Sequence, residues 1–368
     1  MRERKKRLCI VLPDHWAANF GGAEYQAKVL IDELLAHGGF EITYLARNVN
    51  AAFVPAGYGI ERLRTCQRMS RYGDFFDAPS LYSLLRNVRP DVIYQTVGSA
   101  YTGVASFYAR RAGARMVWQI ASDVDVEPFK GGMSLNYPFR YVEKKLLEYG
   151  VRTTTQIIAQ TRVQEELLYR HYQRRADAII PNFHPLPNEP LSKGIPISVA
   201  WVANLKPLKR PEIFIQLAQD LHRETNGARF IVVGRGGKSD WHQMILKTMS
   251  LSPCIEYLGE CSQDNVNALL AQSDILVNTS EYEGFPNTFI QAWMRKVPVI
   301  SMGVDPDGVI QSNSIGYVAK TYVQLCDAVR RLMDDRDLRT EMGERARDFA
   351  LKNYSERNAQ EIIRILEG

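Results

Sequence analysis

Short apolar runs alternate with longer amphipathic stretches along the first half of the chain. The run from Leu8 to Leu12 predicts a buried strand. The stretch from Ala23 to Ala36 predicts a helix, because its apolar residues recur at helical spacing. Further strands are expected at residues 41–46, 92–95, 116–120, 156–160 and 178–180. The alternation predicts a parallel sheet with crossover helices.

The segment from Phe183 to Pro196 is rich in proline and has no periodicity, which marks a domain boundary. After it the alternation restarts, with a helix at 211–225 and strands at 197–202, 229–233, 255–258, 275–278 and 297–301. We therefore expect an α/β fold of two Rossmann-like domains with a ligand in the cleft between them. The expected parts are an N-terminal domain (1–183), a linker (184–196), a C-terminal domain (197–350) and a C-terminal helix (351–368).

Composition supports two ordinary globular domains. The chain has 368 residues, of which 45% are hydrophobic and 24% charged. No apolar run reaches the roughly 20 residues of a membrane span, and the five apolar residues after the basic start are too few for a secretory signal. Five scattered cysteines without a Cys-x-x-Cys pair favour a reducing, cytoplasmic compartment and argue against a zinc site. No metal ligands are expected.

Positive charge is concentrated in the first half of the chain. Residues 1–180 contain 25 Lys and Arg against 18 Asp and Glu, and several of the basic residues lie beside aromatic ones. Examples of these basic clusters are Arg62 to Arg68, Arg71-Tyr72, Phe107 to Arg111 and Tyr169 to Arg175. Two interpretations are open: peripheral contact with an anionic membrane or a lipid phosphate, and solvated helix faces.

The most informative motif lies at residues 280–293, between the strands expected at 275–278 and 297–301. A helix is expected to begin near Asn287, so the amides of Asn287, Thr288 and Phe289 can bind a phosphate. Gly284, Phe285 and Pro286 form the turn before it. Glu283, just before this turn, is unsuited to phosphate but suited to accept hydrogen bonds from sugar hydroxyls.

This motif, Glu-Gly-Phe-Pro-Asn-Thr-Phe-Ile-Gln-Ala-Trp, resembles the Glu-x7-Glu element of the retaining, GT-B-type glycosyltransferases of family 4. The resemblance implies that the position of Gln291 accepts hydrogen bonds from the donor's ribose. The family has glutamate there, so the bond would be neutral rather than charge-assisted. The sequence from Thr288 to Gln291 also fits a capping box, and this alternative is open.

Two further segments resemble the same family. Gly21 and Gly22 open the first helix, where their backbone can approach a phosphate closely. Residues 201–211 resemble the segment whose arginine and lysine neutralise the leaving diphosphate. Lys209 matches the lysine, whereas Asn204 replaces the arginine, so Lys206 or Arg210 is a candidate to compensate.

Weaker likenesses complete the predicted site. Gly234 lies in a glycine-bearing turn, and Leu258 lies where relatives hold the base by backbone contacts. Asp123 follows a strand where relatives often have a histidine near the sugar. The main interpretation of residues 304–308 is a turn, and the second interpretation is a contact to the donor.

The resemblance implies a retaining, metal-independent glycosyltransferase without a cofactor, with Glu283, Lys209 and Asp123 as catalytic residues. It also implies that the C-terminal helix (351–368) packs back on the N-terminal domain. Its donor would be a nucleotide-diphosphate sugar and its acceptor a glycan or a lipid-linked molecule, in bacterial-type polysaccharide or glycolipid synthesis. We expect a cytoplasmic protein, peripheral at the inner face of the membrane if the basic half binds lipid, and no nucleic-acid partner. The alternatives are a catalytically weak nucleotide-sugar-binding subunit, and an epimerase or phosphorylase of the same fold.

Overall fold

The computed structural model describes residues 4–19, 21–64, 73–128, 137–188, 190–191, 193–224 and 227–368. It divides into two compact units, which are described separately. Unit 1 comprises Met1–Asn182 together with Glu356–Gly368, and unit 2 comprises Phe183–Ser355. Cys66, Arg68, Arg71 and Tyr72 lie outside the described residues.

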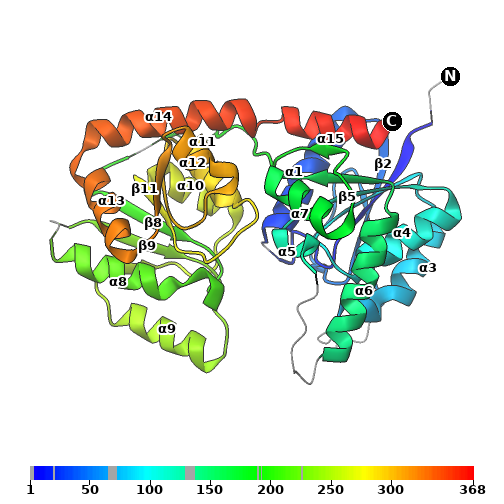
Figure 1. Cartoon of the computed structure of the whole chain (residues 1–368), viewed down its shortest axis with the longest axis horizontal. Coiled ribbons are helices and arrows are strands. Elements are labelled where there is room, and N and C mark those ends of the chain that lie inside the picture. The colour runs from blue at the N-terminus through cyan, green and yellow to red at the C-terminus, as the bar shows by residue number, and fades with distance from the viewer. Residues whose placement is uncertain are drawn as a thin grey trace. The chain divides into compact units, whose positions relative to one another are not determined.

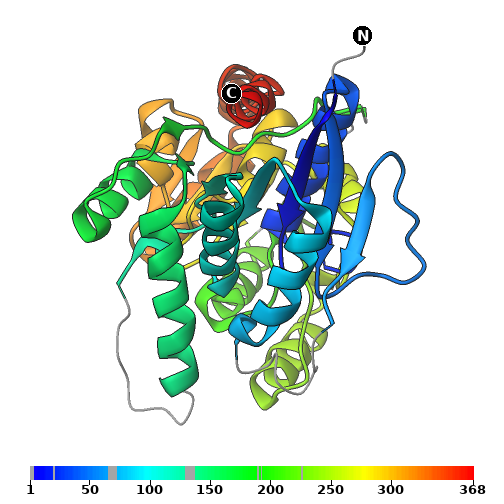
Figure 2. The same ribbon diagram turned by 90° about the vertical axis from the view of Figure 1, so that its right-hand side faces the viewer.

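Unit 1 contains a seven-stranded sheet in the order β3-β2-β1-β4-β5-β6-β7, in which every pairing is parallel. Its strands are β1 (Lys6–Val11), β2 (Phe40–Ala46), β3 (Gly59–Arg62), β4 (Val92–Thr96), β5 (Arg115–Gln119), β6 (Gln156–Ala159) and β7 (Ala178–Ile179). The neighbouring strands β1 and β2, in dark blue, lie side by side in Figure 2. The strand interiors are apolar because helices cover both faces of such a sheet.

The helices of unit 1 come from both of its chain segments (Figure 1). They are α1 (Gly22–His37), the 3-10 helix η1 (Asp74–Asp77), α3 (Ala78–Val88), α4 (Ala100–Ala112), α5 (Asp123–Val126), α6 (Tyr137–Thr153), α7 (Arg162–Tyr172) and α15 (Arg357–Glu367).

Unit 2 contains a six-stranded parallel sheet in the order β10-β9-β8-β11-β12-β13. Its strands are β8 (Ser198–Val202), β9 (Arg229–Val233), β10 (Ile255–Tyr257), β11 (Ile275–Asn278), β12 (Val299–Met302) and β13 (Gly316–Ala319). Its helices are η2 (Pro207–Lys209), α8 (Pro211–His222), α9 (Asp240–Ser250), α10 (Gln263–Gln272), α11 (Asn287–Met294), η3 (Pro306–Gly308), α12 (Val309–Ser312), α13 (Tyr322–Asp334) and α14 (Arg336–Asn353). Apolar clusters lie on both faces of the sheet.

The strand orders determine where each unit can hold a ligand. The order of connection reverses between β1 and β4 in unit 1, and between β8 and β11 in unit 2. Open α/β sheets bind ligands outside the carboxyl ends of the strands at such a reversal. In unit 2 this places the loops after β8 and β11 at the expected position.

The predicted fold class, two Rossmann-like α/β units, is confirmed. The sequence did not predict β3 or β13. β3 is an edge strand with mainly exposed residues, and β13 follows a short helical turn, so neither shows a clear apolar pattern.

The boundaries differ from those drawn from the sequence. The proline-rich segment after Phe183 belongs to unit 2, where the amide of His184 donates to the carbonyl of Tyr354 at 2.9 Å. The final segment was expected to begin at residue 351, but α14 continues to Asn353 and α15 begins at Arg357. Composition marks where a chain lacks periodicity, whereas a domain boundary depends on what the segment contacts.

Helix α15 packs on unit 1 through one apolar face. Ala359, Ile362, Ile363 and Leu366 are buried along this helix. Its last turn is held by Arg115 of β5, which donates to the carbonyl of Leu366 at 3.3 Å. A cation at the C-terminus of a helix is also favoured by the helix dipole.

Candidate active site

The loops that follow β8 and β11 are joined by hydrogen bonds at the carboxyl edge of the unit 2 sheet. The hydroxyl of Thr279, just after β11, donates to the carbonyl of Lys209 at 2.7 Å and accepts from Nε1 of Trp201 at 2.9 Å. The amide of Glu281 donates to the carbonyl of Leu208 at 2.8 Å. Because these bonds are buried or half-buried, they hold the backbone of residues 207–210 against residues 279–281.

Lys209 and Glu283, both predicted site residues, form an ion pair through Nζ and Oε1. The same carboxylate oxygen accepts a hydrogen bond from the hydroxyl of Ser280 at 2.7 Å. The side chains are 19% and 16% exposed, so the pair is largely but not completely shielded from solvent. The structure therefore brings together the cation and the carboxylate that the sequence assigned to leaving group and sugar.

Arg210 does not supply a second free cation at this position. Its guanidinium donates to the backbone carbonyls of Thr279 at 2.7 Å, Ser280 at 3.2 Å and Met302 at 3.2 Å. These carbonyls lie at the ends of β11 and β12, so Arg210 fixes the loop geometry. Of the two residues considered as replacements for the family's arginine, only Lys206 is exposed.

Asn204, at the position of the family's arginine, forms a hydrogen bond with the loop that follows β9. Its Oδ1 accepts from the amide of Arg235 at 3.3 Å. Gly234 is needed there because a Cβ at this position would lie 1.7 Å from the carbonyl oxygen of Ala203. The loops after β8 and β9 therefore pack backbone against backbone.

Leu258 is placed next to this glycine turn. Its amide donates to the carbonyl of Val232 at 3.0 Å, extending the pairing of β10 with β9. The amide of Gly234 donates to the carbonyl of Gly259 at 2.8 Å. The backbone amide of Leu258 is thus engaged within the protein, and its side chain is 43% exposed.

Helix α11 begins at Asn287, as the motif predicted, with Pro286 as its N-cap. The amide of Phe289 donates to the carbonyl of Pro286 at 3.0 Å, so one of the three expected phosphate donors is engaged within the first turn. Gly284 lies in the bend before the helix, and Thr288 is half-buried. Phe285 is buried against the rings of Trp293 and Tyr354, which anchors the turn to the core.

Gln291 is almost completely buried, with 2% of its surface exposed. Its amide group donates to Oε1 of Gln263 at 2.9 Å and to Oδ1 of Asn267 at 2.8 Å, both on α10. The capping-box alternative is wrong, because Pro286 and not Thr288 is the N-cap. The ribose role stays a prediction, and it would use the carbonyl oxygen of this side chain.

In unit 1, Gly21 is the N-cap of α1 and Gly22 is its first residue. The carboxylate of Glu24 lies over Gly21, where an added Cβ would be 2.0 Å from Oε2. An acidic side chain in the first turn is stabilised by the helix dipole. A phosphate at this helix start would therefore require Glu24 to turn away.

Asp123 is the first residue of α5 and is half-buried. The carboxylate that organises this turn belongs to Asp125, which accepts from the amides of Ala121 at 2.9 Å and Ser122 at 3.1 Å. Burial raises the pKa of Asp125, against the lowering effect of these amides. Asp125 was not singled out from the sequence, although Ser122-x-x-Asp125 has the spacing of a helix cap.

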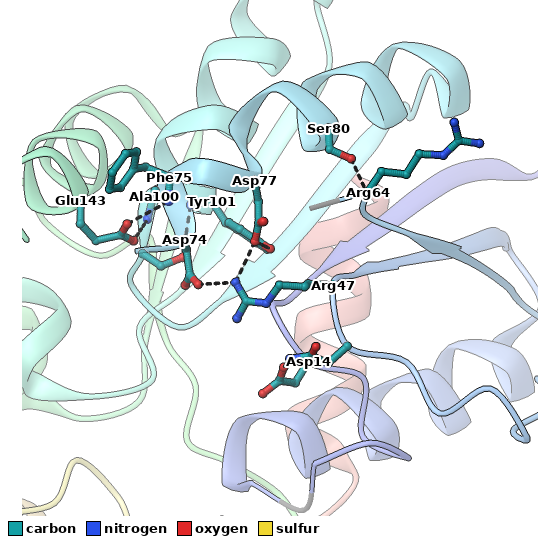
Figure 3. Close-up of polar contacts among 12 residues, drawn as sticks. Asp14, Arg47, Arg64, Asp74, Phe75, Asp77, Ser80, Ala100, Tyr101 and Glu143 are labelled. Carbon is teal, nitrogen blue, oxygen red and sulfur yellow. Dashed lines mark hydrogen bonds and ion pairs between the residues drawn. The ribbon is translucent and has the colours of Figure 1, made fainter. Parts of the chain in front are cut away.

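A charged cluster that the sequence did not predict lies at the carboxyl ends of β1 and β2 (Figure 3). One nitrogen of Arg47 donates to Asp74 Oδ1 and to Asp77 Oδ2, each at 2.8 Å. The hydroxyl of Tyr101 also donates to Asp77, whose side chain is completely buried. These residues are distant in sequence and match no motif, so only the fold reveals the cluster.

Glu143 of α6 lies beside this cluster (Figure 3). Its carboxylate accepts from the amides of Ala100 at 2.6 Å and Phe75 at 3.0 Å, joining the start of α4 to η1. Burial, with a smaller contribution from the charge of Asp74, raises the pKa of Glu143 to about 7 although backbone donors oppose the shift. This carboxyl group is therefore poised to titrate near neutral pH.

Two features of the described residues concern metal binding and membrane insertion. No three His, Cys, Asp or Glu side chains gather there as a metal site would require. None of the described helices has an apolar stretch long enough to cross a bilayer. Independence from metal stays a prediction.

Two family profiles match consecutive parts of the chain. The profile of Glycosyltransferase Family 4 matches residues 20–186, and that of Glycosyl transferases group 1 matches residues 186–349. Together they cover residues 20–349, and they share only residue 186. The boundary between them falls close to the start of unit 2 at Phe183.

The curated relatives are glycosyltransferases. The chain is 23% identical over 221 residues to the poly(ribitol-phosphate) alpha-N-acetylglucosaminyltransferase of Staphylococcus aureus (strain COL), which covers 59% of this chain and 44% of that protein. It is 29% identical over 157 residues to the N-acetyl-alpha-D-glucosaminyl L-malate synthase of Bacillus anthracis, covering 42% and 40%. The matched part spans less than half the length of either relative.

Solved structures share the fold over almost the full chain. Anabaena HepE, in complex with UDP and glucose, has a TM-score of 0.73 at 15% identity, covering 98% of this chain and 99% of that one. WaaG, a glycosyltransferase involved in lipopolysaccharide biosynthesis, has a TM-score of 0.75 at 16% identity, covering 98% and 100%. The two family profiles, which together match residues 20–349, show that the chain belongs to the family 4 glycosyltransferases, and these structures show that it has the GT-B fold.

Proposed function

We propose that the protein is a retaining glycosyltransferase that moves a sugar from a nucleotide-diphosphate sugar to a glycan or lipid-linked acceptor. The observation that carries this proposal is the Lys209–Glu283 pair beside the start of α11, at the carboxyl edge of the unit 2 sheet. A cation, a carboxylate and a helix N-terminus in one place suit a ligand that carries both phosphates and hydroxyl groups.

In the proposed reaction the positive groups stabilise the departing diphosphate. Lys209 and the N-terminus of α11 supply this charge in fixed positions, which lowers the cost of reorganisation in the transition state. Glu283 accepts hydrogen bonds from the sugar and also orients the ammonium group of Lys209. Gln291 would contact the ribose and Leu258 the base.

The relatives guide the choice of donor. Two of them are named as transferring an N-acetylglucosaminyl group, and HepE has been crystallised with UDP-glucose. We therefore propose a UDP-hexose or UDP-N-acetylhexosamine as donor, without a metal or a cofactor. Unit 1, with Asp123, would bind the acceptor, and its basic surface would favour a peripheral position at the cytoplasmic face of the membrane.

The experiment is a thermal-shift panel of UDP-, GDP-, ADP- and dTDP-sugars on the full chain and on Lys209→Ala. We expect the sugars of one nucleotide in this panel to raise the melting temperature of the full chain. The same sugars should raise the melting temperature of Lys209→Ala by a smaller amount. The matched control is Lys247→Ala, an exposed lysine on α9 of the same unit. If no donor raised the melting temperature of the folded protein, the proposal would be wrong.

Product analysis then tests the reaction itself. Transfer with the donor's anomeric configuration kept, measured by NMR, supports a retaining transferase. Free sugar phosphate or an epimerised donor would instead identify a phosphorylase or an epimerase.

A second candidate is a nucleotide-sugar-binding subunit with weak activity. It is favoured by Asn204 and Gln291, because both replace charged residues of the family and both bond within unit 2. Donor binding without transfer or hydrolysis by the purified chain would support this candidate.

A further inference from the structure

Arginines gather around a cavity of about 590 Å³ on unit 1. The arginine and tyrosine residues in its lining are Arg7, Tyr82, Arg86, Arg89, Tyr108 and Arg111. This volume falls within the range of roughly 300 to 1,000 Å³ that is usual for small-molecule sites. Its lining differs from an ordinary site in being dominated by positive charge.

The cavity lies at the opposite edge of the sheet from the cluster around Arg47. It is formed by the start of β1, the segment before β4 and the ends of α3 and α4, two helices that lie side by side (Figure 1). A six-residue strand is about 20 Å long, at about 3.3 Å per residue. The two edges of unit 1 are therefore separate surfaces, and this one has no part in the proposed transfer.

Among the described residues, carboxylates balance the positive charge of the cavity only in part. Asp91 is the carboxylate in its lining, and it already pairs with Arg7 at 3.3 Å and with Arg4 at 3.1 Å. Within the described residues, Arg86, Arg89 and Arg111 form no ion pair or side-chain hydrogen bond. Three like charges around one cavity repel one another, and an anion bound between them would relieve this repulsion.

Helix dipoles explain part of this arrangement. Arg86 and Arg111 lie in the last turns of α3 and α4, where a cation gains about 0.3 to 1 kcal/mol. They do not explain Arg89, which caps α3 in the left-handed conformation at φ 51°. The equivalent position of α4 is Gly113, the residue usually found there. A second observation concerns Arg7, whose Nε is buried and has no hydrogen-bond partner among the residues that the structure describes.

We propose that this cavity binds a phosphate-bearing ligand. Guanidinium groups match phosphate oxygens with paired hydrogen bonds, and several converging arginines can share one anion. Tyr82 and Tyr108 add hydroxyl groups to the lining. The phosphate comes either from a lipid headgroup or from a soluble phosphate compound, and Phe107, exposed beside Arg111, offers apolar contact to a lipid.

The test compares the full chain with the triple variant Arg86→Gln, Arg89→Gln, Arg111→Gln. Pyrophosphate binding is measured by isothermal titration calorimetry, and lipid binding by flotation with phosphatidylcholine vesicles with and without phosphatidic acid. The control triple variant is Arg110→Gln, Arg170→Gln, Arg364→Gln, which removes the same charge from exposed arginines elsewhere on unit 1. If the triple variant does not fold, the same binding measurements are made on the single variant Arg111→Glu.

We expect the cavity variant to lose at least about tenfold in affinity for one probe, because charge-assisted hydrogen bonds are removed, while the control keeps wild-type affinity. Loss on phosphatidic acid vesicles alone identifies a lipid headgroup, and loss for pyrophosphate identifies a soluble phosphate. Binding of neither probe by the wild type, or equal losses in both triple variants, would overturn the proposal. Neither result depends on donor binding, so the proposed transferase function is tested separately.

Discussion

Glu283 has two partners in the structure, the ammonium group of Lys209 and the hydroxyl of Ser280. Replacing Glu283 by Gln keeps its shape but removes the charge that orients Lys209 and strengthens hydrogen bonds to sugar hydroxyls. We expect kcat to fall by at least about 100-fold, as when a positioned group that stabilises a transition state is removed. Steady-state kinetics with a varied donor measure this change.

Glu281→Gln is the control for this variant, because Glu281 is an exposed glutamate two residues earlier in the same loop. Its kcat should match the wild type. An unchanged kcat in Glu283→Gln would show that the ion pair only stabilises the loop.

Gln291 is the second residue for which the structure gives a prediction. Gln291→Ala removes two hydrogen bonds to α10 and leaves the buried oxygen of Asn267 without its donor. We expect the free energy of unfolding to fall by about 1 to 3 kcal/mol, measured by urea denaturation. A double-mutant cycle with Asn267→Ala should show a coupling energy, because the two residues are in contact. Additive losses would contradict this prediction.

At the residue scale, the sequence predicted the chemical role of the site residues but not which side chains they contact. The motif around Glu283 was identified from its residues and its place between two strands, and Lys209 from the resemblance to family 4 glycosyltransferases. Their pairing could not be predicted, since 74 residues separate them and the loop geometry depends on Thr279 and Arg210. The contact of Gln291 with α10 could not be predicted either, because the packing of the helices determines which polar groups meet.

At the scale of elements, Glu143 of α6 joins the start of α4 to η1. Its pKa is raised from 4.5 to about 7, so the folded protein binds a proton more tightly than the unfolded chain. The contribution of this group to stability is complete below pH 4.5 and is lost as the pH rises to about 7. A shift of this size corresponds to about 3 kcal/mol.

Glu143→Gln should remove this dependence. We expect its free energy of unfolding to exceed that of the wild type by an amount that grows between pH 4.5 and 7, measured by denaturation at several pH values. Glu166→Gln, an exposed glutamate on α7, should follow the wild type. Parallel curves for Glu143→Gln and the wild type would contradict the raised pKa.

Strands with a continuous buried apolar run were predictable, whereas an exposed edge strand was not. β1, β9 and β11 agree with the sequence to within two residues, because their apolar runs are continuous. β3 is held by its pairing with β2 rather than by burial of its own side chains. A strand of this kind carries no local signal.

At the scale of the whole molecule, unit 1 is assembled from two distant chain segments. Ile362, Ile363 and Leu366 of α15 are buried within it, and their burial contributes roughly 5 kcal/mol or more. We expect residues 1–182 alone to melt at a lower temperature than unit 1 in the full chain, measured by calorimetry. A peptide of residues 356–368 should raise that melting temperature.

The control peptide carries Ile362→Ser and Leu366→Ser, which removes the apolar face of α15. It should leave the melting temperature of the fragment unchanged. Equal stabilisation by both peptides would show that the apolar face is not what holds α15 on unit 1.

The sequence alone determined the fold class, the family resemblance and the residue types of the donor site, because strand periodicity and short motifs are local properties. The tertiary structure decided which of these residues meet. It paired Lys209 with Glu283, bound Arg210 to backbone carbonyls and placed Gln291 against α10. It also gathered the arginines of the cavity on unit 1, because residues distant in sequence converge only when strands and helices pack.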